Sequence, residues 1–323
     1  MTKLIVSQLD ALRGYVSREF YYVMAELIAR HGWRQIETFR LWKGPGTIER
    51  TLVSEFGGVP RCILFWEGYE FLSAFAEEIY RLDCRKFILA DDLHWWNEPM
   101  RNARSVGFAL CDAVLSTCAY LWDEFYPEFC GTKRVVWIPH SASPDFMLRY
   151  NPSPSNSVFL GGAMTTHYPL RLKMKELHER GSYPIDYQPH PGYYRWHDYE
   201  RDEGVGRAYA ERINACRAGF ADSLVYRYVV AKYFEIPATG ALLLADDSVA
   251  GPLRELGFVE HEHYLPVSEE NLEERIRYVL DESNHVEIDE MRSRGQALVR
   301  QRHKTSDRAT QINEVCAASA RGA

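Results

Sequence analysis

The sequence has no long hydrophobic run. Its best apolar stretch, residues 241–245, is far shorter than the ~20 residues that a membrane-spanning helix needs. The amino terminus lacks the hydrophobic core of a signal peptide, and none of the seven cysteines forms a C-x-x-C pair. We therefore expect a cytoplasmic protein with reduced thiols, no transmembrane segment, and no zinc or redox motif.

The chain also has no excess of positive charge. Lys and Arg together number 38, against 45 Asp and Glu, which gives a net charge of −7. Such a chain has no general attraction for nucleic-acid phosphates, so we expect no nucleic-acid partner. No G-x-G-x-x-G follows the first predicted strand, which argues against a dinucleotide-dependent oxidoreductase.

What the sequence does contain is typical of a globular protein, with 46% hydrophobic and 26% charged residues over 323 positions. Short β-branched runs alternate with amphipathic helical stretches, a pattern that predicts parallel α/β architecture. Residues 151–156 are rich in turn formers and predict a linker. We predict two Rossmann-like α/β domains, residues 1–150 and 157–323, that face a cleft where ligands bind.

The segment 232–247 carries the most chemical information. A carboxylate, Glu235, lies near a predicted helix start, and a glycine turn and the buried strand 241–245 follow it. A carboxylate that faces the cleft can accept hydrogen bonds from two vicinal hydroxyl groups, such as those of a ribose. The alternative is a carboxylate that only caps the helix.

This segment resembles the donor-binding core of group-1-type glycosyltransferases with the GT-B fold, and it is most similar to the CgeB-like (spore-maturation-protein-type) branch. Residues 136–140 resemble the end of that family's N-terminal domain. Residues 161–162 and 168–171 resemble the opening of its C-terminal domain. The ordered set covers roughly residues 60–315.

The resemblance implies a GT-B fold with a C-terminal helix near the domain junction. It implies transfer of a sugar from a nucleoside-diphosphate sugar to an acceptor, which could be a small molecule, a glycan or a protein. The nucleoside-diphosphate sugar is a co-substrate, and no further cofactor is expected. The residues before the linker would form the acceptor side and those after it the donor side.

Two residue roles follow directly from the resemblance. Glu235 matches the glutamate that holds the donor ribose, and Lys232 matches a basic position suited to a diphosphate oxygen. Two positions depart from the family. Arg227 stands where relatives often have a glutamate and is kept as a candidate donor contact, and Ala250 lies in a stretch without the usual acidic residue. These departures keep open an alternative function, a non-catalytic nucleotide- or sugar-binding homologue.

Three further residues of the C-terminal half are candidate donor contacts. The turn at Gly162 allows backbone amides to approach an anion, although it can also be only a tight strand-to-helix turn. Arg171 could reach the phosphates or lie solvated on its helix. His190 could line the nucleotide pocket or be an ordinary loop histidine.

In the N-terminal half, residues 91–96 follow a predicted strand and combine carboxylates, an imidazole and indoles. Asp92 or His94 could take the acceptor proton as a general base, and the indole of Trp95 could stack on a sugar. The alternative is a capping aspartate and a buried tryptophan pair.

Two glycine turns in the same half are weaker candidates. Arg13 and Gly14 follow the first predicted strand and could contact acceptor or phosphate. Glu67 and Gly68 follow the third strand in a similar way.

The doublet Asp246-Asp247 could suggest a metal, but it follows a strand of the C-terminal half, and we interpret it as a turn. We expect a metal-independent reaction in which lysine and helix termini neutralise the diphosphate.

Overall fold

The computed structural model describes residues 2–43, 47–193 and 195–318. The chain divides into two compact units, which are described separately. Unit 1 comprises Met1–Arg13, Val23–Pro139 and Arg308–Ala323, and unit 2 comprises Gly14–Tyr22 and His140–Asp307. Among the described residues, no helix combines the length and the apolar composition needed to cross a membrane.

This division corrects the predicted boundary. The chain passes into unit 2 at His140, and the predicted linker, residues 151–156, lies inside unit 2. There the Asn151 side chain donates to the Asn214 carbonyl (3.0 Å), and Arg292 donates to the Asn151 carbonyl (2.9 Å). Turn-forming residues predicted an exposed loop, but their composition does not show whether a loop joins domains or lies within one.

Unit 1 is built on a parallel six-stranded sheet with strand order β2-β1-β3-β4-β5-β6. Its central strands are buried along their whole length, as expected when helices cover both faces of a parallel sheet. The strands are β1 (Lys3–Ser7), β2 (Trp33–Glu37), β3 (Cys62–Trp66), β4 (Arg85–Ala90), β5 (Ala113–Ser116) and β6 (Arg134–Trp137).

The helices of unit 1 connect these strands, and α2 begins within the segment that belongs to unit 2. They are α1 (Leu9–Arg13), α2 (Glu19–His31), α3 (Thr38–Trp42), α4 (Ile48–Phe56), α5 (Tyr69–Ala74), α6 (Ala76–Arg81), α7 (Glu98–Leu110) and α8 (Trp122–Phe125).

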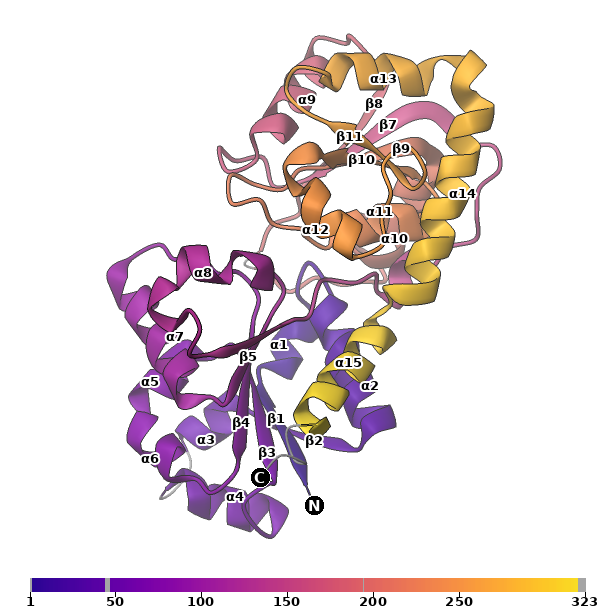
Figure 1. Ribbon diagram of the computed structural model, residues 1–323. Helices are drawn as coiled ribbons and strands as arrows, with labels where there is room; N and C mark the ends of the chain where they lie inside the picture. Colours follow the sequence, from indigo (N-terminus) through magenta and orange to yellow (C-terminus); the bar gives the residue numbers. More distant parts are fainter. Residues whose placement is uncertain (1, 44–46, 194, 319–323) are drawn as a thin grey trace. The chain divides into compact units, whose positions relative to one another are not determined.

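The C-terminal helix α15 (Thr305–Ala318) begins in unit 2 and continues in unit 1 from Arg308. Within unit 1 it lies beside α2 (Figure 1), and the indole of Trp33 donates to the Asn313 side chain over 3.1 Å. Unit 1 is therefore formed by the N-terminal part of the chain together with the C-terminal helix.

Unit 2 contains a parallel five-stranded sheet with strand order β11-β10-β9-β7-β8. The strands are β7 (Ser155–Gly162), β8 (Ile185–Pro189), β9 (Cys216–Ala221), β10 (Leu242–Asp246) and β11 (Tyr264–Val267). The helices are α9 (Pro169–Glu179), α10 (Gly206–Ala215), α11 (Lys232–Thr239), α12 (Ala250–Glu255), α13 (Leu272–Leu280) and α14 (His285–Arg302).

Strand β10 corresponds to the apolar run at 241–245, and the whole strand is buried. It pairs with β9 on one side and β11 on the other, so both of its faces must be apolar. Its side chains join Leu160, Phe220 and Ile276 in the core of the unit. The parallel α/β architecture predicted from the sequence is therefore confirmed in both units.

Candidate functional site

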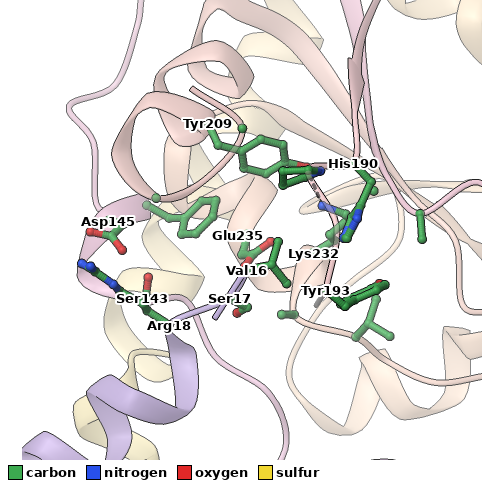
Figure 2. A pocket seen from close by; sticks show the side chains of 18 of the residues that line it. Val16, Ser17, Arg18, Ser143, Asp145, His190, Tyr193, Tyr209, Lys232 and Glu235 are labelled. Atoms are coloured by element: carbon green, nitrogen blue, oxygen red, sulfur yellow. Dashed lines mark hydrogen bonds between the residues drawn. The ribbon is translucent and has the colours of Figure 1, made fainter. Parts of the chain in front are cut away.

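Unit 2 holds a cavity of about 840 Å³, here called the unit 2 pocket. It lies where β7 and β8 end and where α11 begins, the edge at which open parallel sheets bind ligands. The segment 16–18, which precedes α2, closes part of its wall. The polar lining residues on which the description depends are Arg18, Asp145, Arg171, His190, Tyr193, Tyr199, Tyr209, Lys232 and Glu235. Figure 2 labels all of these except Arg171 and Tyr199.

Helix α11 presents Lys232 and Glu235 to this pocket. The two residues are three positions apart, a spacing that places them on one face of a helix. The helix ends at Gly240, whose left-handed backbone (φ 94°) turns the chain into β10. The predicted pair is therefore brought together by local helix geometry.

The Glu235 side chain is only 7% exposed, and no hydrogen bond from the described residues reaches its carboxylate. It makes no helix-capping hydrogen bond, because Ala231 occupies the N-cap position. Burial raises the pKa of this carboxyl to about 7, while the positive charge of Lys232 opposes the rise. A carboxylate kept buried without a protein partner, at the wall of a cavity, is suited to hold a ligand.

Two cations converge on Gly162 at the end of β7. The backbone there has φ 108°, and a Cβ atom would lie 2.8 Å from Nη1 of Arg171 and 2.9 Å from Cε of Lys232. Only glycine fits this conformation and this spacing without strain. Two positive side chains therefore lie next to a residue that has no side chain of its own, an arrangement suited to bind an anion. We call Gly162, Arg171 and Lys232 the anion cradle.

Arg171 is 2% exposed, which excludes the solvated alternative. Its guanidinium donates to the Ala163 carbonyl (2.9 Å) and lies 3.7 Å from the Tyr168 ring centroid. The buried Nε has no hydrogen-bond partner among the described residues. Lys232 donates to the Tyr209 hydroxyl. These contacts with neutral groups hold both cations in place beside Gly162.

His190 follows β8 and lines the unit 2 pocket. Its contact with a nucleotide stays a prediction. Its ring centroid is 4.3 Å from that of Tyr193. Burial, with the charges of Lys232 and Arg171, lowers its pKa to about 4, so the imidazole is neutral at pH 7. The pair forms an uncharged aromatic wall.

The sequence analysis missed the side of the pocket formed by Arg18 and Asp145. The guanidinium of Arg18 lies 3.4 Å from the Tyr199 ring centroid. The Asp145 carboxylate accepts a hydrogen bond from Tyr22 (3.1 Å), and burial raises the pKa of its carboxyl. In the view of Figure 2, Glu235 lies between this side and the side formed by Lys232. No motif marks either residue. Arg18 joins the pocket through the long-range attachment of residues 14–22 to unit 2, and Asp145 lies in unit 2 ahead of β7.

Arg13 and Gly14 do not line the unit 2 pocket. Arg13 is exposed at the end of α1. The carbonyl of Gly14 accepts a hydrogen bond from the His197 amide (2.8 Å), and a Cβ atom there would lie 2.1 Å from the Trp196 ring. The glycine is needed for packing within unit 2. The predicted contacts of Arg13 and Gly14 with acceptor or phosphate stay predictions.

Arg227 is not among the residues that line the unit 2 pocket. It lies exposed in a turn with φ 61°, and its amide donates to the Leu224 carbonyl (3.1 Å). A contact between Arg227 and the donor stays a prediction.

Asp92, His94 and Trp95 lie after β4 in unit 1. The Asp92 carbonyl accepts a hydrogen bond from Arg104. His94 is buried, edge-on to Trp96 with ring centroids 4.9 Å apart. The Trp95 ring centroid lies 5.7 Å from that of Tyr126. Their roles in catalysis and acceptor binding stay predictions.

The Asp246-Asp247 doublet forms the predicted turn. The Asp246 carboxylate accepts hydrogen bonds from the Ser223 hydroxyl (2.6 Å) and the Ser248 amide (3.0 Å). Over the described residues, no cluster of three His, Cys, Asp or Glu side chains is placed to hold a metal ion.

Comparison with known proteins places this geometry in context. Residues 173–314 match the family described as glycosyl transferase-like. A search of curated protein sequences found no match. Sucrose-phosphate synthase from Thermosynechococcus elongatus has a similar fold, with a TM-score of 0.64, 11% identity and full coverage of both chains.

HepE from Anabaena, solved with UDP and glucose, superposes with a TM-score of 0.61 at 12% identity, covering 98% of this chain and 100% of that one. The pneumococcal O-GlcNAc transferase GtfA, solved with UDP and GlcNAc, has a TM-score of 0.51 at 10% identity over 85% of this chain and 60% of that one.

The fold is that of the GT-B glycosyltransferases, as predicted. Lys232 and Glu235 both lie within residues 173–314, the region that matches the glycosyl transferase-like family. The finer resemblance to the CgeB-like branch stays a prediction.

Proposed function

We propose that the protein transfers a sugar from a nucleoside-diphosphate sugar to an acceptor, without a metal ion, and that unit 2 binds the donor. The observation that carries this proposal is the buried Glu235 carboxylate, which no described residue hydrogen-bonds, one helical turn from Lys232. Neighbours of the same fold were solved with UDP and sugars, which supports the assignment of the donor class.

Each part of such a donor has a counterpart in the pocket. The ribose hydroxyls would donate hydrogen bonds to Glu235, and the base would lie against the uncharged rings of His190 and Tyr193. The diphosphate would occupy the cradle at Gly162, where Arg171 and Lys232 approach. A ligand in this orientation would satisfy the carboxylate and neutralise both cations.

The same cradle supplies the chemistry of the transfer. As the glycosidic bond breaks, negative charge builds up on the leaving diphosphate. Preorganised cations stabilise this charge more in the transition state than in the ground state, which lowers the barrier. Because Arg171 and Lys232 provide two positive charges at one point, the proposal needs no metal ion. Asp92 and His94 of unit 1 stay the proposed residues for the acceptor proton.

The test combines binding and turnover. UDP, GDP, ADP and the corresponding glucose conjugates are screened by thermal shift, and nucleotide release is then measured with and without EDTA. A ligand at 100 times its dissociation constant adds about 2.7 kcal/mol of stability, which is easily detected. We expect one nucleotide class to stabilise the protein and its sugar conjugate to be consumed in the presence of EDTA.

Lys232→Ala is the diagnostic variant, and Lys175→Ala on α9, a partly exposed lysine paired with Glu179, is its matched control. We expect Lys232→Ala to weaken nucleotide binding at least about tenfold, the loss of one charged hydrogen bond, and Lys175→Ala to leave it unchanged. Binding without turnover would instead indicate the non-catalytic homologue. Absence of binding by every nucleotide would overturn the proposal.

A further inference from the structure

Unit 1 contains a hollow of its own, which the proposed function does not use. It encloses about 910 Å³ and lies where β1 and β3 end, between α5 and α7. All of its lining residues belong to unit 1. We call it the Glu67 pocket, after the carboxylate that follows β3.

Glu67 is held in an unusual backbone conformation with φ 55°, which a non-glycine residue rarely adopts. Its amide donates to the Leu89 carbonyl (3.0 Å), which fixes the turn after β3. Burial, followed by the negative charge of Asp91, raises the pKa of the Glu67 carboxyl to about 7, and Arg104 opposes the rise. The turn therefore presents a carboxylate that is only partly solvated.

Two buried side chains form part of the wall of the Glu67 pocket. The Arg104 side chain is 7% exposed and donates to the Asp92 carbonyl, while its Nε has no partner among the described residues. Tyr69 is 9% exposed and lies 4.6 Å, measured from its ring centroid, from the Arg104 guanidinium. Because the Arg104 Nε and the Tyr69 hydroxyl lie below the accessible surface, the polar groups that a ligand can reach here are the carboxylates of Glu67 and Glu70.

The charge of the lining restricts that ligand. Glu67 and Glu70 outnumber the single cation, Arg104, in the Glu67 pocket. The adjoining hollow shares Glu70 and adds the carboxylates of Asp10 and Glu37, against one cation, Lys43. The surplus of carboxylates would repel an anionic ligand, whereas uncharged hydroxyl groups can donate hydrogen bonds to them.

The adjoining hollow also carries two aromatic rings. Phe39 is 56% exposed and Trp42 is 45% exposed, and both line this hollow on α3. Exposed aromatic faces next to carboxylates are suited to a sugar ring, because its C–H face packs on the aromatic ring while its hydroxyls reach the acids.

We propose that the Glu67 pocket and the hollow beside it bind an uncharged saccharide, with Glu67 accepting hydrogen bonds from its hydroxyls and Trp42 packing against a ring face. The inference rests on the proposed function, because this saccharide would be the acceptor. It narrows the acceptor class to neutral carbohydrates and excludes uronic acids and other anionic sugars.

The test measures saccharide binding to the full chain with UDP present, by saturation-transfer NMR and tryptophan fluorescence. The probes are maltose, cellobiose, lactose and chitobiose at millimolar concentration, with glucuronic acid as the anionic comparison. We expect at least one neutral disaccharide to bind and glucuronic acid not to bind. Glu67→Gln should weaken the binding about tenfold, as expected for one hydrogen bond to a charged group.

Trp42→Ala provides a second variant on an exposed side chain, and Tyr80→Ala on α6, whose side chain is 77% exposed, is its matched control. We expect Trp42→Ala to weaken saccharide binding and Tyr80→Ala to leave it unchanged. UDP affinity, measured in parallel, should be the same in all three variants. Saccharide binding that survives both Glu67→Gln and Trp42→Ala would overturn the inference.

Preferential binding of glucuronic acid, or no binding by any disaccharide of the panel, would overturn it as well. These outcomes are separable from a failure of the proposed function. If the disaccharide binds while no nucleotide does, the Glu67 pocket is confirmed as a saccharide site and the transferase proposal fails.

Discussion

Replacing Glu235 by glutamine is expected to stabilise the unliganded protein while weakening nucleotide binding. In the folded protein, burial raises the pKa of this carboxyl from its ordinary value of 4.5 to about 7. A carboxyl with a raised folded-state pKa contributes stability that is fully present below about pH 4.5. That stability is lost as the pH rises through about 7, because the folded state then has to bury a charge.

The pKa difference sets the magnitude. It corresponds to at most about 3 kcal/mol of lost stability above pH 7. Glutamine has nearly the same shape and no charge, so Glu235→Gln should recover much of this free energy at pH 8. The gain should shrink as the pH falls toward 4.5. For a domain of this size, each kcal/mol shifts the melting temperature by roughly 2–4 °C.

Nucleotide affinity should change in the opposite direction. A carboxylate can accept hydrogen bonds from both ribose hydroxyls, whereas the amide offers a single acceptor oxygen. Loss of a charge-assisted hydrogen bond costs about 1.5–3 kcal/mol, which corresponds to about 10- to 100-fold in affinity for UDP.

The assay is differential scanning fluorimetry at pH 5 and pH 8, with and without UDP, on wild type and variant. Glu176→Gln, which removes an exposed carboxylate from α9, is the control and should change neither quantity. The reasoning is refuted if Glu235→Gln is less stable than wild type at pH 8. Unchanged affinity for UDP would refute the ribose contact separately.

Three further predictions concern the same pocket. Gly162→Ala should lower UDP affinity at least about tenfold, because the added Cβ would crowd Arg171 and Lys232. Wild-type affinity in a calorimetric titration would contradict the anion cradle. Because the pKa of His190 is about 4, His190→Asn should leave the pH dependence of UDP binding between pH 5.5 and 8 unchanged; a shifted midpoint would show that the imidazole titrates there. Turnover should persist in EDTA, and full loss of turnover that manganese restores would contradict the metal-independent mechanism.

Several features were predictable from the sequence because they depend on short-range rules. The spacing of Lys232 and Glu235 places both on one helix face, and Gly240 ends that helix, so their pairing needed no tertiary information. The continuous apolar run at 241–245 predicted a strand buried on both faces, which β10 confirms.

The burial of Glu235, by contrast, was not predictable from composition. The same residue at the same helical position would be an ordinary exposed carboxylate if the pocket wall were absent. Its pKa near 7 depends on side chains from distant parts of the chain, including Glu19, His140 and Asp145.

The sequence by itself determined the alternation of strands and helices, the edge at which ligands bind, and the two residues that α11 presents to the pocket. Only the tertiary structure decided that residues 14–22 join unit 2, which brings Arg18 into the pocket, and that Arg227 lies exposed outside the pocket lining. The physical reason is the range of the interactions. Helix and strand periodicity acts over a few residues, whereas membership of a unit is set by which distant surfaces bury one another, and no local pattern encodes that choice.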